Sequence, residues 1–231
     1  LSEDGELLRL VVLNDPEDLS ARLALARVAE RNEAWSSVIQ EYVGIAELQV
    51  GEPAAAALHR AAMTAWEHQG DRDRAIGLLG EALECLEDIA QFPQAFLDLA
   101  AIYAGEGDDS AAAAVLAPLL EVAGRLDSEV ASQVIEQVIA GDQAELAFPV
   151  LAELEEKHPE SVPLQKTVMS YLRTQGDWEG LSERLAWVGS ELGDHLSDLE
   201  ICAMAEQGQL QIDASFAQEA RQRVVASGGA I

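Results

Sequence analysis

The chain has 231 residues, of which 42 are acidic and 14 are basic, so its formal net charge at pH 7 is -28. A field of this sign repels phosphate backbones, which argues against nucleic-acid binding and favours a protein partner with a basic segment. Hydrophobic residues make up 49% of the chain and aromatic residues only 5%, a composition that is typical of packed helices. We therefore expect an all-α protein with a single domain over residues 1–231.

The first segment is apolar at helical spacing from Glu6 to Leu13 and resembles the second helix of an earlier hairpin, so residues 1–18 are expected to form a partial hairpin. Acidic Glu3 and Asp4 stand where a signal peptide needs a basic segment. The longest uncharged apolar run, Ala111–Leu120, is too short to cross a bilayer, and no membrane insertion is expected. The chain is expected to be a piece of a longer protein.

Four glycine–aspartate pairs punctuate the middle of the chain at separations of 37, 34 and 35 residues, each between two apolar helical stretches. Glycine adopts the left-handed conformation that ends a helix, and aspartate caps the free amides that begin the next. Such a period predicts helical repeats whose bends lie at these pairs. The pairs are Gly70-Asp71, Gly107-Asp108, Gly141-Asp142 and Gly176-Asp177.

Five repeats are expected over residues 19–190. The first keeps the apolar spacing but has Asn32-Glu33 in place of Gly-Asp. The apolar stretches Leu196–Ala205 and Ala214–Val225 then predict a helical cap over residues 194–226, after which order is expected to end. Ala112 falls where two helices must approach closely, so it is expected to be buried.

These units resemble the tetratricopeptide repeat, which has a Gly-Asp bend between two helices and small residues at their contact. The residues that match the family pattern are the segment from His68 to Ala75 together with Ala82, and a second group of residues in the next unit. That second set is Phe96, Leu99, Ala100, Tyr103, Gly107, Asp108 and Ala112. The resemblance implies a right-handed α-solenoid of antiparallel hairpins with a concave groove lined by the first helices.

The resemblance also implies which side chains face that groove. Transferred unit by unit, these partner-binding positions are Arg27, Arg60, Thr64, Gln94, Leu97, Asp98, Ala101, Glu129, Gln133, Glu136, Lys166, Ser170 and Arg173. The set is basic at both ends and acidic in its middle, so a peptide or helix with a basic centre would complement it. The alternative is that these are only solvated polar side chains.

No short signature of catalysis or cofactor binding is present. Glu155 and His158 have the three-residue spacing of carboxylate-bridged metal sites but lack a second facing pair, so no metal is expected. Cys85 and Cys202 belong to no metal or redox motif and are expected to pack as reduced thiols. Reduced thiols favour a cytoplasmic location.

The sequence thus predicts a non-catalytic protein–protein interaction scaffold that binds a peptide or helix of a partner along its groove, without a cofactor. Two alternatives stay open at this point. The chain is a structural subunit of a homo-oligomer or larger assembly, or it is a regulatory or docking segment of a larger enzyme.

Overall fold

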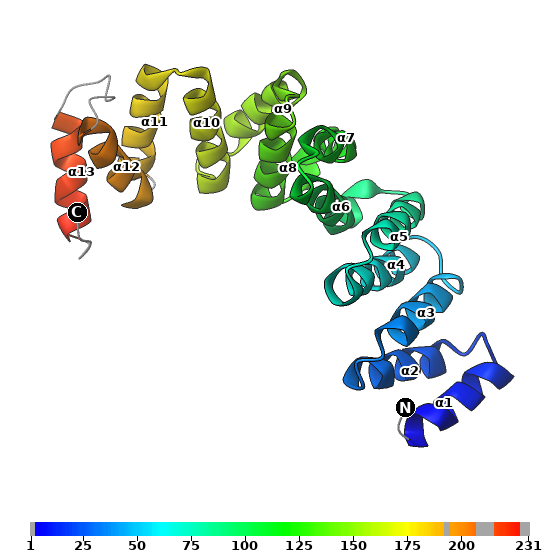
Figure 1. The fold of residues 1–231 in the computed structure, drawn as a ribbon. Helices are drawn as coiled ribbons and strands as arrows, with labels where there is room; N and C mark the ends of the chain where they lie inside the picture. The colour runs from blue at the N-terminus through cyan, green and yellow to red at the C-terminus, as the bar shows by residue number, and fades with distance from the viewer. Residues whose placement is uncertain (1–2, 192–194, 207–214, 227–231) are drawn as a thin grey trace. The chain divides into compact units, whose positions relative to one another are not determined.

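A computed structural model describes residues 3–191, 195–206 and 215–226 (Figure 1). Regular structure in these residues is entirely helical, which confirms the expected all-α class. The chain divides into two compact units, residues 1–122 and residues 123–231. Each unit is described by itself below, and the expectation of one repeat domain over the whole chain stays a prediction.

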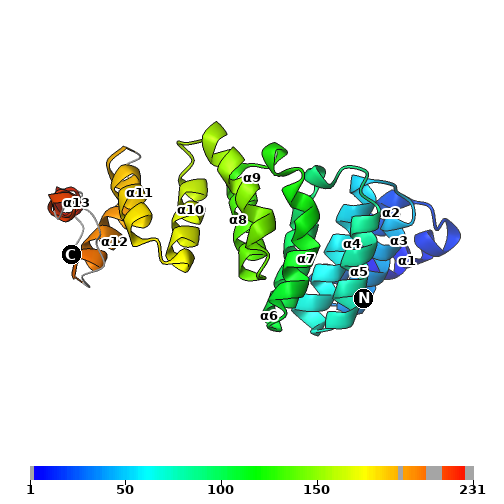
Figure 2. The same cartoon turned by 90° about the horizontal axis from the view of Figure 1, so that it is seen from above.

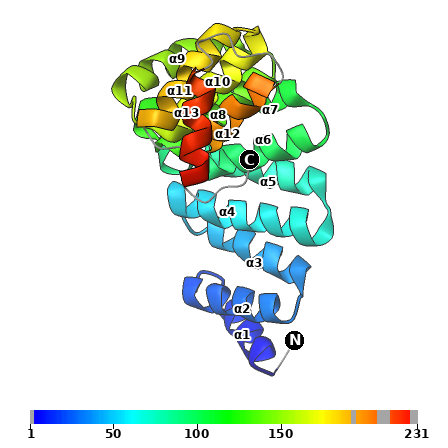
Figure 3. The same cartoon turned by 90° about the vertical axis from the view of Figure 1, so that its left-hand side faces the viewer.

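Unit 1 contains seven α-helices among its described residues, and consecutive helices pack against each other from α1 through α7. Figure 3 shows α2, α3, α4 and α5 as successive layers. The helices are α1 (Glu3–Asn14), α2 (Leu19–Arg31), α3 (Trp35–Ala46), α4 (Glu52–Thr64), α5 (Arg72–Glu84), α6 (Pro93–Gly105) and α7 (Asp109–Leu120). Two short elements join them, the π-helix η1 (Ala65–Gln69) and the 3-10 helix η2 (Ile89–Gln91).

Unit 2 contains six α-helices among its described residues. Helix α8 packs against both α9 and α10, and α10 through α13 pack in chain order; Figure 2 shows α8 and α9 side by side. The helices are α8 (Ser128–Ala140), α9 (Ala144–Lys157), α10 (Val162–Gln175), α11 (Trp178–Glu191), α12 (His195–Glu206) and α13 (Ser215–Ala226), preceded by the 3-10 helix η3 (Ala123–Arg125). The residues after 226 lie outside the described part of the chain.

Three of the four predicted bends are confirmed. The glycines of these pairs, Gly70, Gly107 and Gly176, have φ between 62° and 79° in the left-handed region. The aspartate that follows each one accepts a hydrogen bond from the backbone N–H three residues on, so it caps the next helix. The helices on either side of each bend pack against each other.

The prediction for Gly141-Asp142 was wrong in its detail. Here Asp142 takes the left-handed conformation with φ 63°, while Gly141 has φ -79°. The N-cap of α9 is Gln143, whose side chain makes no capping hydrogen bond. The bend between α2 and α3 has the same form, with Glu33 at φ 53° before the N-cap Ala34. The Gly141-Asp142 pair therefore stands one residue earlier in its bend than the other Gly-Asp pairs do, with Asp142 in the left-handed position and Gln143 at the N-cap.

Backbone hydrogen bonds give a common register for the bends. The N–H of the residue before the second helix donates to the carbonyl five residues earlier, as in Ala34 to Ala29, Asp108 to Tyr103, Gln143 to Val138 and Asp177 to Leu172. At the second bend Asp71 donates instead to Ala65, six residues earlier. The difference is the π-helix η1, which holds one extra residue within its turn.

Each unit also contains an arginine–carboxylate pair beside a glycine. In unit 1, Arg22 Nη1 donates to Glu41 Oε2 at 3.2 Å, and its guanidinium lies over Gly44. Both side chains are at most 16% exposed. Because a side chain at Gly44 would displace the guanidinium, this glycine permits α2 and α3 to pack closely.

In unit 2 the corresponding pair joins the last two helices. The Arg223 guanidinium donates through Nε and Nη2 to the carboxylate of fully buried Asp198, with Nη2 at 2.6 Å from Oδ1. This hydrogen bond to Asp198 is the main reason that the pKa of Arg223 is raised. Because the buried Asp198 carboxylate is shielded from water, it depends on Arg223 to compensate its charge. The pair therefore holds α13 on α12.

Candidate binding site

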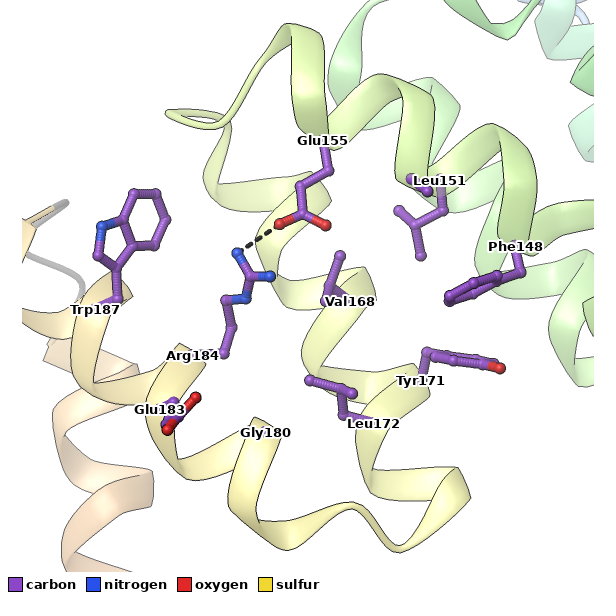
Figure 4. A pocket seen from close by; sticks show the side chains of 11 residues that line it. Phe148, Leu151, Glu155, Val168, Tyr171, Leu172, Gly180, Glu183, Arg184 and Trp187 are labelled. Atoms are coloured by element: carbon purple, nitrogen blue, oxygen red, sulfur yellow. Dashed lines mark ion pairs between the residues drawn. The ribbon is translucent and has the colours of Figure 1, made fainter. Parts of the chain in front are cut away.

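A cavity with a volume of about 440 Å³ opens between α9, α10 and α11 of unit 2 (Figure 4). Most of its wall is apolar, and the polar side chains gather on one side. Its lining residues are Phe148, Leu151, Ala152, Glu155, Val168, Tyr171, Leu172, Gly180, Glu183, Arg184 and Trp187. The volume lies in the range of sites that take a small ligand or a few side chains.

Helical spacing brings these side chains to one face of each helix. On α9, Leu151 and Ala152 stand three and four residues after Phe148, and Glu155 stands three residues after Ala152. The lining residues of α11, from Gly180 to Trp187, repeat the same intervals. Because residues at these intervals share a helix face, the three helices present continuous stripes to the cavity.

The polar side of the pocket is built around Arg184. Its Nη1 lies 2.5 Å from Glu155 Oε1, so the pair connects α11 with α9, as the dashed line in Figure 4 shows. The same nitrogen donates to Gln165 Oε1 at 3.0 Å. Gln165 is fully buried in α10, and its Nε2 donates to the carbonyl of Pro159 at 3.0 Å. Three helices are thus joined through one guanidinium.

Aromatic rings occupy two parts of the wall. Phe148 of α9 and Tyr171 of α10 lie with ring centroids 4.7 Å apart and planes tilted by 34°. Phe148 is 45% exposed, although it is a large apolar side chain. On the other side of the pocket, the Arg184 guanidinium lies 6.0 Å from the centre of the Trp187 ring. An incoming apolar group would therefore meet Phe148 and Tyr171 on one side, while Trp187 lies beyond the Arg184–Glu155 pair (Figure 4).

Of the predicted groove residues in unit 1, several have partners within the protein. Arg60 pairs with Glu30 at 3.1 Å, and Glu30 also accepts a hydrogen bond from the Tyr42 hydroxyl. Desolvation, followed by the charge of Glu30, raises the pKa of Tyr42. Asp98 lies 2.6 Å from His59 Nε2 and accepts a hydrogen bond from Gln94 at 2.9 Å. Arg27 and Ala101 are exposed.

In unit 2 the predicted residues lie on α8 and α10. Glu129, Gln133 and Ser170 are exposed, and Lys166 is half-buried. Two others contact neighbouring helices. Glu136 Oε1 accepts a hydrogen bond from the Thr167 hydroxyl at 3.0 Å, and Arg173 forms an ion pair with Glu200 of α12. Much of the charge assigned to the groove is therefore compensated within each unit.

Two of the predicted contact residues are not accessible to a partner. Thr64 is 5% exposed and Leu97 is 3% exposed. The extra residue of η1 shifts Thr64 by one position relative to the bend at Gly70-Asp71. Leu97 stands eleven residues before the cap Asp108, and Ser132 stands equally far before Gln143 and is also buried.

The pocket was not predicted, because the resemblance implies a binding groove lined by the first helices alone. Its walls come mainly from α9 and α11, the second helices of their hairpins. The sequence held one signal, which is that Phe148, Tyr171 and Trp187 fall on three consecutive helices. Glu155, considered above as a metal ligand, is instead the partner of Arg184, and His158 Nδ1 lies 3.9 Å from Glu160.

No family model matches the chain, and no curated protein sequence is significantly similar to it. Among the described residues, no group of three or more histidine, cysteine or acidic side chains is placed to hold a metal ion. None of the described helices is long and apolar enough to span a membrane. Cys85 and Cys202 are free thiols, half-buried and buried respectively.

Proposed function

We propose that this chain is a non-catalytic scaffold of tetratricopeptide-like helical hairpins, arranged as a solenoid, that binds a segment of a protein partner. The observation that carries the proposal is the pocket of unit 2, which is open, mostly apolar and lined by rings from three helices. Such a cavity suits one or two side chains of a bound segment. The Arg184, Glu155 and Gln165 side chains in its wall satisfy one another, and we expect the pocket to work without a cofactor.

The packing of consecutive helices supports the same proposal. Hairpins that bury a stripe on each neighbour leave their outer faces free for binding, as repeat proteins do. The exposed first-helix residues Arg27, Ala101, Gln133 and Ser170 remain candidates for further contacts along the bound segment.

A selection from a random peptide library tests the proposal. The full chain should enrich peptides, and Ala152→Trp should lose them, because the indole fills the pocket from an exposed position in the middle of α9. The matched control is Ala114→Trp, which adds the same side chain to an exposed position of α7. Equal enrichment by both variants, with unchanged circular dichroism, would contradict a binding role for the pocket.

The second candidate function is that of a subunit in an assembly. It is favoured by α1, which exposes Leu7, Leu10 and Leu13 to between 62% and 72%, together with Val11. Sedimentation velocity over a range of protein concentrations separates the two functions. Self-association that Leu10→Glu abolishes, in the absence of any peptide, favours the assembly subunit; a monomer at all concentrations favours the scaffold.

A further inference from the structure

The carboxylates around the pocket of unit 2 define what kind of segment it would accept. Glu183 lines the pocket directly. Glu145 and Glu156 lie on α9 within one turn of lining residues, and Glu179 lies one turn before Glu183 on α11. All four side chains belong to exposed residues, and none has an ion-pair partner among the described residues. The edge of the pocket is therefore negatively charged.

The cation in the pocket wall does not offset this charge. Arg184 is bound to Glu155 at 2.5 Å and to Gln165 at 3.0 Å, and its side chain is 29% exposed. A guanidinium in this position is already neutralised by its own carboxylate partner. An acidic group on an incoming segment would have to break that pair and approach the free glutamates as well. The site thus discriminates against acidic ligands.

The apolar part of the pocket lies next to these carboxylates. Phe148 and Tyr171 form one wall, and Leu172 and Val168 come from the same helix as Tyr171. A segment that fits must therefore offer an apolar side chain and, beside it, positive charge. Another copy of this chain is a poor occupant, because its acidic residues outnumber its basic residues by 42 to 14.

We propose that the pocket between α9, α10 and α11 binds a cationic amphipathic segment of a protein partner. An aliphatic or aromatic anchor enters beside Phe148 and Tyr171, and lysine or arginine side chains beside the anchor pair with Glu183 and Glu179. The anchor supplies apolar burial, while the pairs set the orientation of the segment and accelerate its association. This inference rests on the proposed scaffold function and adds the chemistry of the partner.

Fluorescence anisotropy with three labelled peptides of about four helical turns tests the inference. The first has leucine at intervals of three and four residues and lysine at the other positions, so that the leucines share one helix face; the second replaces lysine with glutamate, and the third replaces leucine with serine. The full chain should bind the leucine–lysine peptide at least about tenfold more tightly than either of the others. Ala152→Trp should weaken that binding, whereas Ala114→Trp should not.

The charge requirement is tested with Glu179→Gln/Glu183→Gln. This variant should lose affinity for the leucine–lysine peptide several-fold at low salt, and the loss should shrink as salt is added. The matched control, Glu81→Gln/Glu84→Gln, makes the same change of charge on exposed residues of α5. Equal losses in the two variants, or equal affinity for the leucine–lysine and leucine–glutamate peptides, would overturn the inference.

The inference and the scaffold function fail in different ways. If the library selection yields peptides that depend on an open pocket but carry no excess of basic residues, the cationic partner is wrong and the scaffold stands. If neither the library nor the leucine–lysine peptide distinguishes Ala152→Trp from Ala114→Trp, the pocket has no binding role and both proposals fall.

Discussion

Two glycines within helices of unit 1 have opposite surroundings, although both are flanked by ordinary helical residues. A Cβ at Gly44 would lie 2.3 Å from Arg22 Nη1, a contact that a side chain cannot make. At Gly77 of α5 there is open space within 4 Å. Gly44 is therefore needed for Arg22 to pack against α3. Gly77 serves no such contact and only lowers the stability of α5 relative to alanine.

We expect Gly44→Ala to lower the free energy of unfolding by about 1–3 kcal/mol, because the new methyl group displaces Arg22 and leaves the nearly buried Glu41 without its partner. Gly77→Ala should raise it by about 0.5–1 kcal/mol through helix propensity alone. Urea unfolding monitored by circular dichroism measures both. The packing assigned to Arg22 is wrong if the two variants shift stability in the same direction.

Among the helical elements, η1 differs from the others in its hydrogen bonding. It continues α4 and ends at Gly70 with the bond from Asp71 to Ala65, one residue longer than at the other bends. Trp35 of α3 stacks on His68 within this turn, with ring centroids 3.7 Å apart and planes parallel within 2°. The extra residue is thus accommodated locally, and the helices before and after it keep their contacts.

Deletion of Glu67, which is exposed in η1, should therefore be tolerated, because it converts the π-turn into ordinary α-helix and restores the register of the other bends. Deletion of Glu81, exposed in the last turn of α5, should destabilise more, because it rotates the following residues, which include fully buried Ala82, by about 100° about the helix axis. Thermal melts compare the two. If deletion of Glu67 is the more harmful, the π-turn is not a tolerated insertion.

Much of the helical organisation could be predicted because a glycine followed by an aspartate marks the end of one helix and the N-cap of the next. This sufficed at Gly70, Gly107 and Gly176. It failed in detail at Gly141, where Asp142 adopts the left-handed conformation instead. Asparagine and aspartate tolerate that conformation, so the pair Gly-Asp fits the turn in two registers and only tertiary packing selects between them.

The candidate binding pocket could not be predicted in the same way. Its residues are ordinary members of helix faces, and the cavity depends on how far α9, α10 and α11 lie from one another. The contacts of Arg184 show the difficulty, since Glu155 and Gln165 are distant from it in sequence and on two other helices. Repeat spacing gives the face of each helix, whereas the separation between helices follows from the volumes of all the side chains between them.

At the scale of the whole molecule, the net charge of -28 opposes folding, because like charges repel one another more strongly in the compact state. The salt bridges that neutralise part of it lie within the units, as between Arg22 and Glu41 or Arg223 and Asp198. The remaining carboxylates repel one another across the surface, and this repulsion disfavours the compact state. Added salt screens charges beyond about 8–10 Å and so relieves long-range repulsion more than it weakens close pairs.

We expect the melting temperature to rise when sodium chloride is increased from a few millimolar to about 0.15 M. The variant Glu106→Lys/Glu121→Lys, which changes two exposed residues and lowers the net negative charge, should melt higher at low salt and respond less to it. Differential scanning calorimetry measures both effects. A melting temperature that falls with salt in the unmodified chain would show that its attractive pairs outweigh the repulsion.

The bridge from Arg184 to Glu155 and Gln165 has a kinetic consequence. Because these side chains hold one another, the cavity is already open and shaped before any ligand arrives. Complex formation then needs no slow rearrangement of the receptor, and most of the ordering cost falls on the incoming chain. The observed rate of association should accordingly increase in proportion to ligand concentration, without reaching a plateau.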